Sequence, residues 1–465
     1  MRRPSIAVAV CSALLATGCT AVTATPQRVV PTAAVPDSAG LSTPVADPIY
    51  PRRGNAGIDV LRYRLDLTWD TRTFSGTATL TVRATRALDS LVLDLSSTYA
   101  LDAVTLDGAP VTGALADDKL TVPHPLAADG RATLVVRYRG TPTSTPMPSH
   151  RTDAVGLGLN IGTDGSLWTM QEPYGAFTWY PANDIPSDKA LYDIAVTVPA
   201  GWAGIASGTP GPVQGSTYRY TTSDPVASYL TTLAVGRYQK TTGTGPGGLP
   251  LTYWTRAGDA ERLPFLQRSP ALITWLEQRL GPYPFPTAGV VLVESPSGME
   301  TQQMVTLGGR VQPAKLEGVL LHEYAHHWFG DTVTPATWKD VWLNEGWATY
   351  LQRVWEAERD HTDLAGWERA ARAADGGLRT AAGPPGDPKP GSFAEGNVYT
   401  CAALMLHEIR KLVGDAEFWA LARDWPGQHR GSTQDRASFT AFVNQHTGRD
   451  LTALIDRWLD SPTTP

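Results

Sequence analysis

The segment LLHEYAHHWFGD, residues 320–331, constrains the fold of this chain more than any other stretch. Its apolar side chains are typical of a buried helix, yet it also carries three histidines and a glutamate. A polar group that is buried without a bonding partner costs free energy. The segment therefore predicts a helix whose polar side chains share a partner inside the protein.

His322 and His326 are four residues apart, so on a helix they lie about 40° apart around the axis and about 6 Å along it. Two imidazoles that face the same way can bind one metal ion, and zinc takes three protein ligands at a catalytic site. Glu345, which follows His326 after eighteen residues in the predicted helix 343–357, is the best third ligand. Glu323 lies beside the ligand row, where its carboxylate can act as a general base. We therefore predict one Zn²⁺ per chain, held by His322, His326 and Glu345.

An alternative interpretation is a helix whose histidines are capped or face solvent. It does not explain why Leu320, Leu321, Trp328 and Phe329 make the same helix resemble a core element. His327 lies about 140° around the helix from His322, so we do not count it as a ligand.

Length, composition and charge exclude some classes of partner. A chain of 465 residues with 42% hydrophobic side chains predicts two or three domains, each with a packed core. The formal net charge is −6, and no block of lysine and arginine occurs. Nucleic acid is therefore not an expected partner.

The sequence pattern changes along the chain. Residues 50–243 contain short segments in which apolar and polar side chains alternate, such as Leu61–Trp69, and these predict an antiparallel β-sandwich-like domain. The glycines and prolines of residues 241–250 indicate a hinge. Residues 244–465 are predicted to be mostly helical. The expected elements are a strand at 289–295, helices at 269–280, 314–329, 343–357, 397–413, 415–424, 435–446 and 450–459, and a loop at 375–392.

The N-terminus has the pattern of an export signal. Arg2 and Arg3 precede an apolar run that is too short to span a bilayer, and small residues lead to Cys19. We expect residues 1–19 to be a signal peptide with a lipobox, Cys19 to be lipidated, and residues 20–49 to form a disordered linker. The protein would then be an exported bacterial lipoprotein at the cell surface, bound to the membrane only through that lipid. The alternative is free secretion after cleavage near Ala24.

Four stretches resemble the aminopeptidase N family of zinc metallopeptidases, the gluzincins, and the likeness runs from about residue 55 to 460. HEYAHHWFGDTVTPATWKDVWLNEGWATYLQ, residues 322–352, is similar to the family's zinc segment. SGMETQQMVTLG, residues 297–308, resembles its Gly-Ala-Met-Glu-Asn signature, in which Met299 and Glu300 match while Gly298 and Thr301 replace Ala and Asn. Two further stretches, residues 171–201 and 397–419, resemble those that contribute Glu172 and Tyr399.

The resemblance implies roles for these residues. Glu300 would bind the α-amine of the substrate, with Gly298 and Met299 beside it and Glu172 as a second anchor. Tyr399 would stabilise the oxyanion, and Glu323 would be the general base. The expected activity is zinc-dependent hydrolysis of the N-terminal peptide bond of peptides with a free N-terminus.

The resemblance also implies a fold, in which a β-sandwich-like domain precedes a thermolysin-like α+β catalytic domain that is mostly helical. The chain looks like a short form of the family without its C-terminal helical domain, so we expect a more open site. Two alternatives remain at this stage. One is a zinc hydrolase of another specificity, an endopeptidase or an esterase, and the other is a non-catalytic surface binding module.

Overall fold

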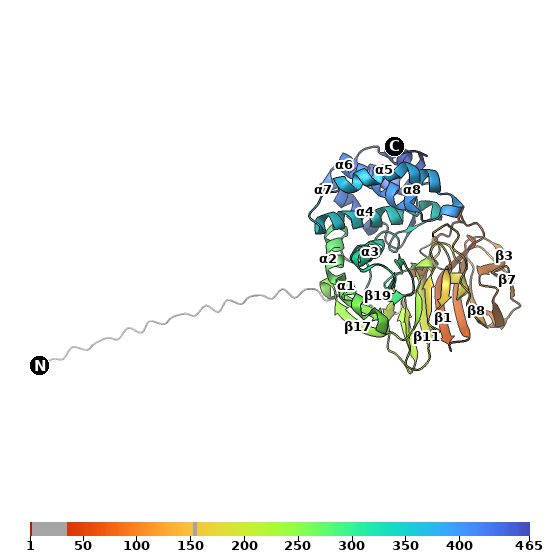
Figure 1. The fold of residues 1–465 in the computed structure, drawn as a ribbon. Helices are drawn as coiled ribbons and strands as arrows, with labels where there is room; N and C mark the ends of the chain where they lie inside the picture. Colours follow the sequence, from red (N-terminus) through yellow and green to blue (C-terminus); the bar gives the residue numbers. More distant parts are fainter. Residues whose placement is uncertain (2–34, 152–155) are drawn as a thin grey trace.

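The computed structural model describes Met1 and residues 35–151 and 156–465 (Figure 1). Strands form the N-terminal part, and helices cover the C-terminal part at the top of the view. Residues 2–34, which include the rest of the predicted signal peptide, Cys19, Ala24 and part of the predicted linker, lie outside the described residues. No helix among the described residues is long and apolar enough to cross a membrane.

The N-terminal domain contains three sheets. Its largest sheet runs in the order β13-β14-β11-β1-β2-β8-β4-β5, with β15 paired to β11, and the other two run β12-β16-β10-β9 and β3-β7-β6. The strands are β1 Ile58–Trp69, β2 Phe74–Ala84, β3 Leu88–Asp94, β4 Tyr99–Leu106, β5 Ala109–Pro110, β6 Ala114–Ala116, β7 Lys119–Leu126, β8 Arg131–Gly140, β9 Gly158–Ile161, β10 Leu167–Met170, β11 Lys189–Thr197, β12 Ala203–Ala206, β13 Thr209–Pro210, β14 Thr217–Thr221, β15 Val226–Ala227 and β16 Leu233–Gly236.

The alternation predicted for β1 is present, because buried and exposed residues alternate from Tyr63 to Trp69. One face of this strand therefore packs in the core, as period-two alternation requires. Most pairs in the large sheet are antiparallel, and the β1–β11 pair is parallel. The prediction of a β-rich domain before a helical one is confirmed.

The catalytic domain has a five-stranded sheet in the order β17-β18-β19-β21-β20 and a two-stranded sheet β22-β23. The strands are β17 Gln239–Thr244, β18 Pro250–Thr255, β19 Ala288–Val293, β20 Gly298–Met299, β21 Val305–Gly308, β22 Thr334–Pro335 and β23 Thr433–Gln434. The helices are α1 Leu263–Leu266, α2 Ser269–Leu280, α3 Pro313–His326, α4 Trp342–Arg359, α5 Ala365–Ala382, α6 Ala402–Val413, α7 Asp415–Gln428, α8 Arg436–Thr447 and α9 Thr452–Asp460.

The hinge predicted at 241–250 is wrong, because this segment is a β-hairpin. β17 pairs antiparallel with β18, and Gly247 and Gly248 supply the positive φ angles of the turn between them. Both strands belong to the sheet of the catalytic domain, so the domain boundary falls before Gln239. The glycines serve a tight turn rather than a flexible connection.

The loop predicted at 375–392 is wrong for its first part, which belongs to helix α5. Inside that helix Arg379 Nε donates to Asp375 Oδ2 at 2.8 Å, and both side chains are buried. Arg379 Nη1 also donates to the carbonyl oxygen of Trp458. These buried contacts hold a helix across Gly376 and Gly377, whose intrinsic helix propensity is poor.

The linker prediction for residues 20–49 is wrong for its described part. The backbone N–H of Val45 donates to Ser187 Oγ of the β domain at 2.8 Å. Asp47 Oδ2 accepts the backbone N–H of Trp338 in the catalytic domain at 2.7 Å. The folded part therefore begins well before residue 50, and this segment contacts both domains.

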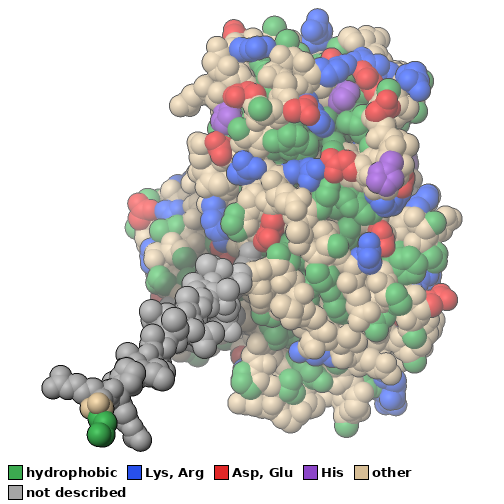
Figure 2. Space-filling model, turned by 90° about the vertical axis from the view of Figure 1, so that its left-hand side faces the viewer, with side chains coloured by type: hydrophobic (Ala, Val, Ile, Leu, Met, Phe, Trp, Pro, Cys, Tyr) green, Lys and Arg blue, Asp and Glu red, His purple; other side chains and the backbone are tan. Residues whose placement is uncertain are grey.

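Acidic and basic side chains are interspersed over the face shown in Figure 2. No single sign of charge dominates that face, in agreement with the modest net charge.

Candidate active site

Helix α3 presents its histidines to a pocket between the two domains. Pro313 occupies the first turn of α3, where its missing N–H is not needed. His322 and His326 follow on one face, as predicted, and the helix ends at His326, three residues before its predicted end. His326 Nδ1 lies 3.1 Å from the carbonyl oxygen of Phe329, and this contact orients the other ring nitrogen toward the pocket.

Helix α4 brings Glu345 over the two imidazoles, as the sequence predicts. Glu345 Oε2 lies 3.2 Å from His322 Nε2 and 3.5 Å from His326 Nε2. Burial alone would raise the pKa of Glu345, but His326 and His322 outweigh it and hold this pKa below its usual range. The three side chains are buried or nearly so, and their ligand atoms all lie within 4.8 Å of one another.

The donor set of these three residues fits a zinc ion. With ligand bonds of about 2.0–2.1 Å, a tetrahedral zinc site places its ligand atoms about 3.3 Å apart. The two distances from Glu345 to the histidines match that separation. Two imidazoles and one carboxylate leave a fourth position for a water molecule or a substrate, as in catalytic zinc sites.

His327 is not part of this site, in agreement with the sequence analysis. Its Nδ1 lies 2.7 Å from the hydroxyl of Tyr283, and its ring packs edge-on against the rings of Phe285 and Tyr324. Burial lowers the pKa of His327 to about 3. The side chain is therefore a neutral core histidine.

Glu323 lies beside the ligand row at the pocket wall, where the sequence places the general base. Burial raises the pKa of Glu323 well above its ordinary value. The backbone of Gly298 approaches this carboxylate so closely that a Cβ at position 298 would lie 2.3 Å from Glu323 Oε1. Gly298 therefore leaves the space that the Glu323 side chain occupies.

Glu300 and Glu172 reach the same cluster from two other segments. Ligand atoms of Glu300, Glu323 and His326 lie within 4.8 Å of one another, as do those of Glu172, Glu300 and Glu345. Oε1 of Glu172 and Oε1 of Glu300 are both buried, and neither has a hydrogen-bond partner among the described residues. Burial raises the pKa of both carboxyls, and Glu300 raises that of Glu172 further. Two such buried carboxyl oxygens can bind a cation.

The two sequence neighbours of Glu300 pack into the core. Met299 does not line the pocket: it is 3% exposed, and its Sδ accepts the backbone N–H of Gln171 at 3.4 Å. Thr301 is fully buried, and its hydroxyl lies 2.8 Å from that of Thr306 in β21. The expected substrate contact of Met299 is therefore replaced by a core contact.

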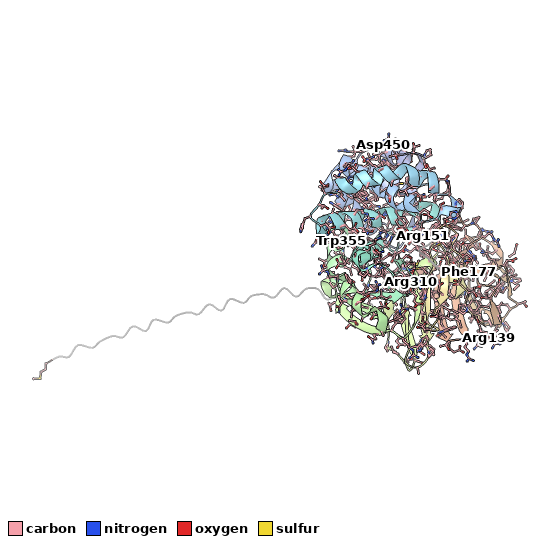
Figure 3. All side chains as sticks on the ribbon, in the orientation of Figure 1. Arg139, Arg151, Phe177, Arg310, Trp355 and Asp450 are labelled. Atoms are coloured by element: carbon pink, nitrogen blue, oxygen red, sulfur yellow. The ribbon has the colours of Figure 1, made fainter. Side chains whose placement is uncertain are left out.

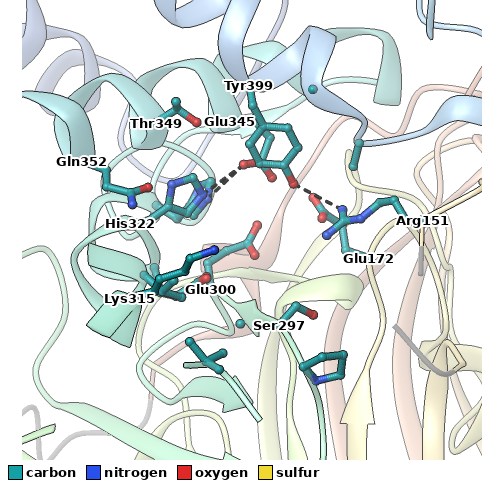
Figure 4. Close-up of a pocket in the computed structure, with 18 of the residues that line it drawn as sticks. Arg151, Glu172, Ser297, Glu300, Lys315, His322, Glu345, Thr349, Gln352 and Tyr399 are labelled. Carbon is teal, nitrogen blue, oxygen red and sulfur yellow. Dashed lines mark hydrogen bonds and ion pairs between the residues drawn. The ribbon is translucent and has the colours of Figure 1, made fainter. Parts of the chain in front are cut away.

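Tyr399 closes the pocket from the side of helix α6. The helix predicted at 397–413 has two parts, because Asn397–Cys401 forms a π-helical turn before α6. Single π turns inside helices occur often at functional sites. The Tyr399 ring stacks on that of His322, with centroids 6.1 Å apart, and Figure 4 shows its hydroxyl directed toward Arg151 and Glu172.

Sequence reasoning missed Arg151, which belongs to the N-terminal domain. Its Nη1 donates to the hydroxyl of Tyr399 at 3.3 Å (Figure 4). Its charge also lowers the pKa values of Glu172, Glu300 and Glu323, although burial raises all three further. Arg151 has no motif around it in the sequence, and only the packing of the two domains brings it to the pocket (Figure 3).

Comparisons with known proteins decide the family. A model described as the peptidase family M1 domain matches residues 266–458, and one described as the peptidase M1 N-terminal domain matches residues 60–230. A crystal structure of an M1 zinc metallopeptidase from Deinococcus radiodurans is 30% identical, with a TM-score of 0.79, over 91% of this chain and 98% of that one. The chain belongs to peptidase family M1. This M1 peptidase brings His322, His326 and Glu345 together, and it has the family fold of a β domain followed by a helical catalytic domain.

Three further matches extend the comparison. Aminopeptidase N of Lactobacillus delbrueckii subsp. lactis is 25% identical over 434 residues, which are 86% of this chain and 50% of that protein. A second Deinococcus structure, bound to a Tyr-Ser-Ala substrate, is 29% identical, with a TM-score of 0.78, and covers 91% of this chain and 99% of that one. A leucine aminopeptidase 2-1 of Meyerozyma guilliermondii is 30% identical over 44% of this chain and is matched over 35% of its own length. This M1 peptidase therefore spans half or less of the length of these two curated relatives.

Proposed function

We propose that this M1 peptidase is a zinc aminopeptidase that removes the first residue of peptides with a free N-terminus. The observation that carries the proposal is a pair of buried carboxyl oxygens, one each on Glu172 and Glu300, next to the candidate metal ligands. Neither oxygen has a hydrogen-bond partner among the described residues. A buried carboxylate needs an opposite charge, and the α-ammonium of a peptide supplies it. The names of the relatives and the Tyr-Ser-Ala substrate of the Deinococcus structure support the same activity.

The chain's own residues divide the chemistry between them. Glu300 and Glu172 hold the ammonium group, so that only the first peptide bond reaches the metal ligands. Zinc, when bound, polarises the scissile carbonyl and lowers the pKa of a water molecule toward 7. Glu323 takes the proton of the attacking water and passes it to the leaving amine. Tyr399 donates its hydroxyl hydrogen to the oxyanion that develops on the carbonyl oxygen.

The proposal predicts that a free amine is essential. The zinc-loaded protein should cleave Leu-Ala-Ala and should not cleave its N-acetylated form. Glu300→Gln should lower kcat/KM for the free peptide about 10- to 150-fold, the loss expected for a hydrogen bond to a charged group. Peptide cleavage followed by mass spectrometry measures both effects.

Glu395→Gln is the matched control, because Glu395 lines the same pocket outside the carboxylate cluster. It should change kcat/KM much less than Glu300→Gln does. Equal cleavage of free and acetylated peptides would contradict the proposal and favour an endopeptidase. Cleavage of ester substrates alone would favour an esterase.

We also propose that the protein acts outside the cytoplasm, as a lipoprotein anchored through Cys19. The support comes from the sequence, in which a charged start, an apolar run and small residues lead to that cysteine. Cells fed an alkyne-tagged fatty acid should label the wild type and should not label Cys19→Ala, while Cys401→Ala should still be labelled. An unlabelled wild type recovered from the medium with its N-terminus near residue 25 would instead indicate free secretion.

A further inference from the structure

We propose that the same pocket recognises the C-terminal carboxylate of short peptides through Arg310 and Lys315. This inference rests on the proposed function, since it names the length class of the substrates. The pocket has a volume of about 790 Å³, and both cations line it together with the metal ligands and the carboxylate cluster. It is therefore large enough for a peptide of several residues.

The pocket-lining side chains of helix α3 and its neighbours differ in charge between the two ends of the helix. Glu300 and Glu323 gather around His326 at the C-terminal end of the helix, within 4.8 Å of its ligand nitrogen. Lys315 lies in the first turn of the same helix, and Arg310 precedes the helix by three residues. The amine of a substrate therefore belongs at the His326 end, and a negative group fits the opposite end.

Lys315 and His322 share one face of α3. They are seven residues apart, which is close to two full turns, and Figure 4 shows the side chain of Lys315 extending from α3 into the pocket. The helix dipole adds positive potential at this end, near Gln312.

Arg310 and Lys315 are available for an anion. Both residues are exposed, and neither forms an ion pair with any other described residue. Arg353 also lines the pocket, but its Nη1 already pairs with Glu356 Oε2 at 2.6 Å. The two unpaired cations are thus the groups best placed to receive a carboxylate.

The spacing selects a peptide length. Seven helical residues separate Lys315 from His322, which corresponds to about 10 Å along the axis. An extended peptide advances about 3.3–3.6 Å per residue, so about three residues cover that distance. Glu300 and Glu172 hold the amine of the peptide. Its C-terminal carboxylate then reaches Arg310 and Lys315 when two or three residues follow the cleaved bond. Tripeptides and tetrapeptides meet this condition.

The test compares peptides that differ only in their C-terminal group. The acids Leu-Ala-Ala and Leu-Ala-Ala-Ala should have kcat/KM values about 5- to 30-fold above those of their C-terminal amides, as for a partly exposed hydrogen bond to a charged group. For an eight-residue peptide of leucine followed by seven alanines, the ratio of acid to amide should approach one. The double variant Arg310→Gln/Lys315→Met should bring the ratio to about one for the short peptides as well.

A control pair of substitutions separates local recognition from net charge. The double variant Arg52→Gln/Arg86→Gln also removes two positive charges, but from exposed positions outside the pocket. It should keep the wild-type ratio of acid to amide cleavage. The inference is overturned if acids and amides are cleaved equally by the wild type, or if the control pair abolishes the ratio as the pocket pair does.

A binding measurement separates this inference from the proposed function. In the zinc-loaded Glu323→Gln variant, Leu-Ala-Ala should bind about 5- to 30-fold more tightly than its amide by calorimetry, and Arg310→Gln/Lys315→Met should remove the difference. If acids and amides are cleaved equally well, the inference of a carboxylate site is wrong, but the proposed aminopeptidase activity stands. Absence of cleavage of any free peptide would overturn the proposed function, and equal binding of acid and amide would overturn the carboxylate site.

Discussion

Glu323→Gln should lower kcat for aminoacyl-anilide hydrolysis by about 10²- to 10⁴-fold, the usual contribution of a general base. Glutamine keeps the size of the side chain but cannot accept and return a proton. Because Glu323 lies beside the three predicted ligands His322, His326 and Glu345 and is not one of them, the zinc content should stay at one per chain. Steady-state kinetics and elemental analysis of the same preparation measure both quantities.

Glu317→Gln provides the control for this substitution. Glu317 belongs to the same helix, but it pairs with Arg268 outside the pocket, so its replacement should leave kcat close to the wild-type value. If Glu323→Gln kept full turnover at normal zinc content, another group would have to serve as the base.

Glu345→Ala should abolish both zinc binding and activity, because it removes one of the three predicted protein ligands. A metal ion present at about 1,000 times its Kd stabilises the folded state by about 4 kcal/mol. For a catalytic domain of this size that corresponds to a rise in Tm of roughly 8–16 °C when zinc is added to the apo wild type. The variant should show no such rise, and its rate should equal that of the chelator-treated wild type.

The control for this experiment is Glu358→Gln, which changes an exposed carboxylate near the end of the same helix. It should retain the zinc-dependent rise in Tm. A stoichiometric zinc ion in Glu345→Ala would show that the ligand set is wrong, whatever the activity of the variant.

Much of the fold follows from local patterns in the sequence. Alternation of apolar residues locates β1, and the apolar stripe between Ser269 and Leu280 gives the bounds of α2, because each pattern reflects one buried face of one element. The patterns failed at 241–250 and 375–382, where glycine-rich composition indicated flexibility. There a paired strand and a buried Arg379–Asp375 contact with distant partners outweigh the local preference.

The candidate site also contains residues that the sequence predicts and one that it does not. The spacing of His322, Glu323 and His326 determines their arrangement by itself, because one helix fixes their mutual positions. Arg151 could not be found in this way. It lies in a different domain from Tyr399, and no short-range pattern encodes a contact between residues 248 positions apart.

The sequence by itself determined that this chain has a β-rich half, a helical half and one helix built to hold a metal ion. Periodicity and helical geometry are local, so they can be evaluated without coordinates. Only the tertiary structure decided that Met299 turns into the core and that Arg310 and Lys315 line the same pocket as the candidate metal ligands. It also decided that Glu172 and Glu300 keep buried oxygens, and Arg310 and Lys315 keep charges, that pair with no other described residue. Burial and charge pairing depend on the neighbours that distant segments provide, and those neighbours exist only in the folded chain.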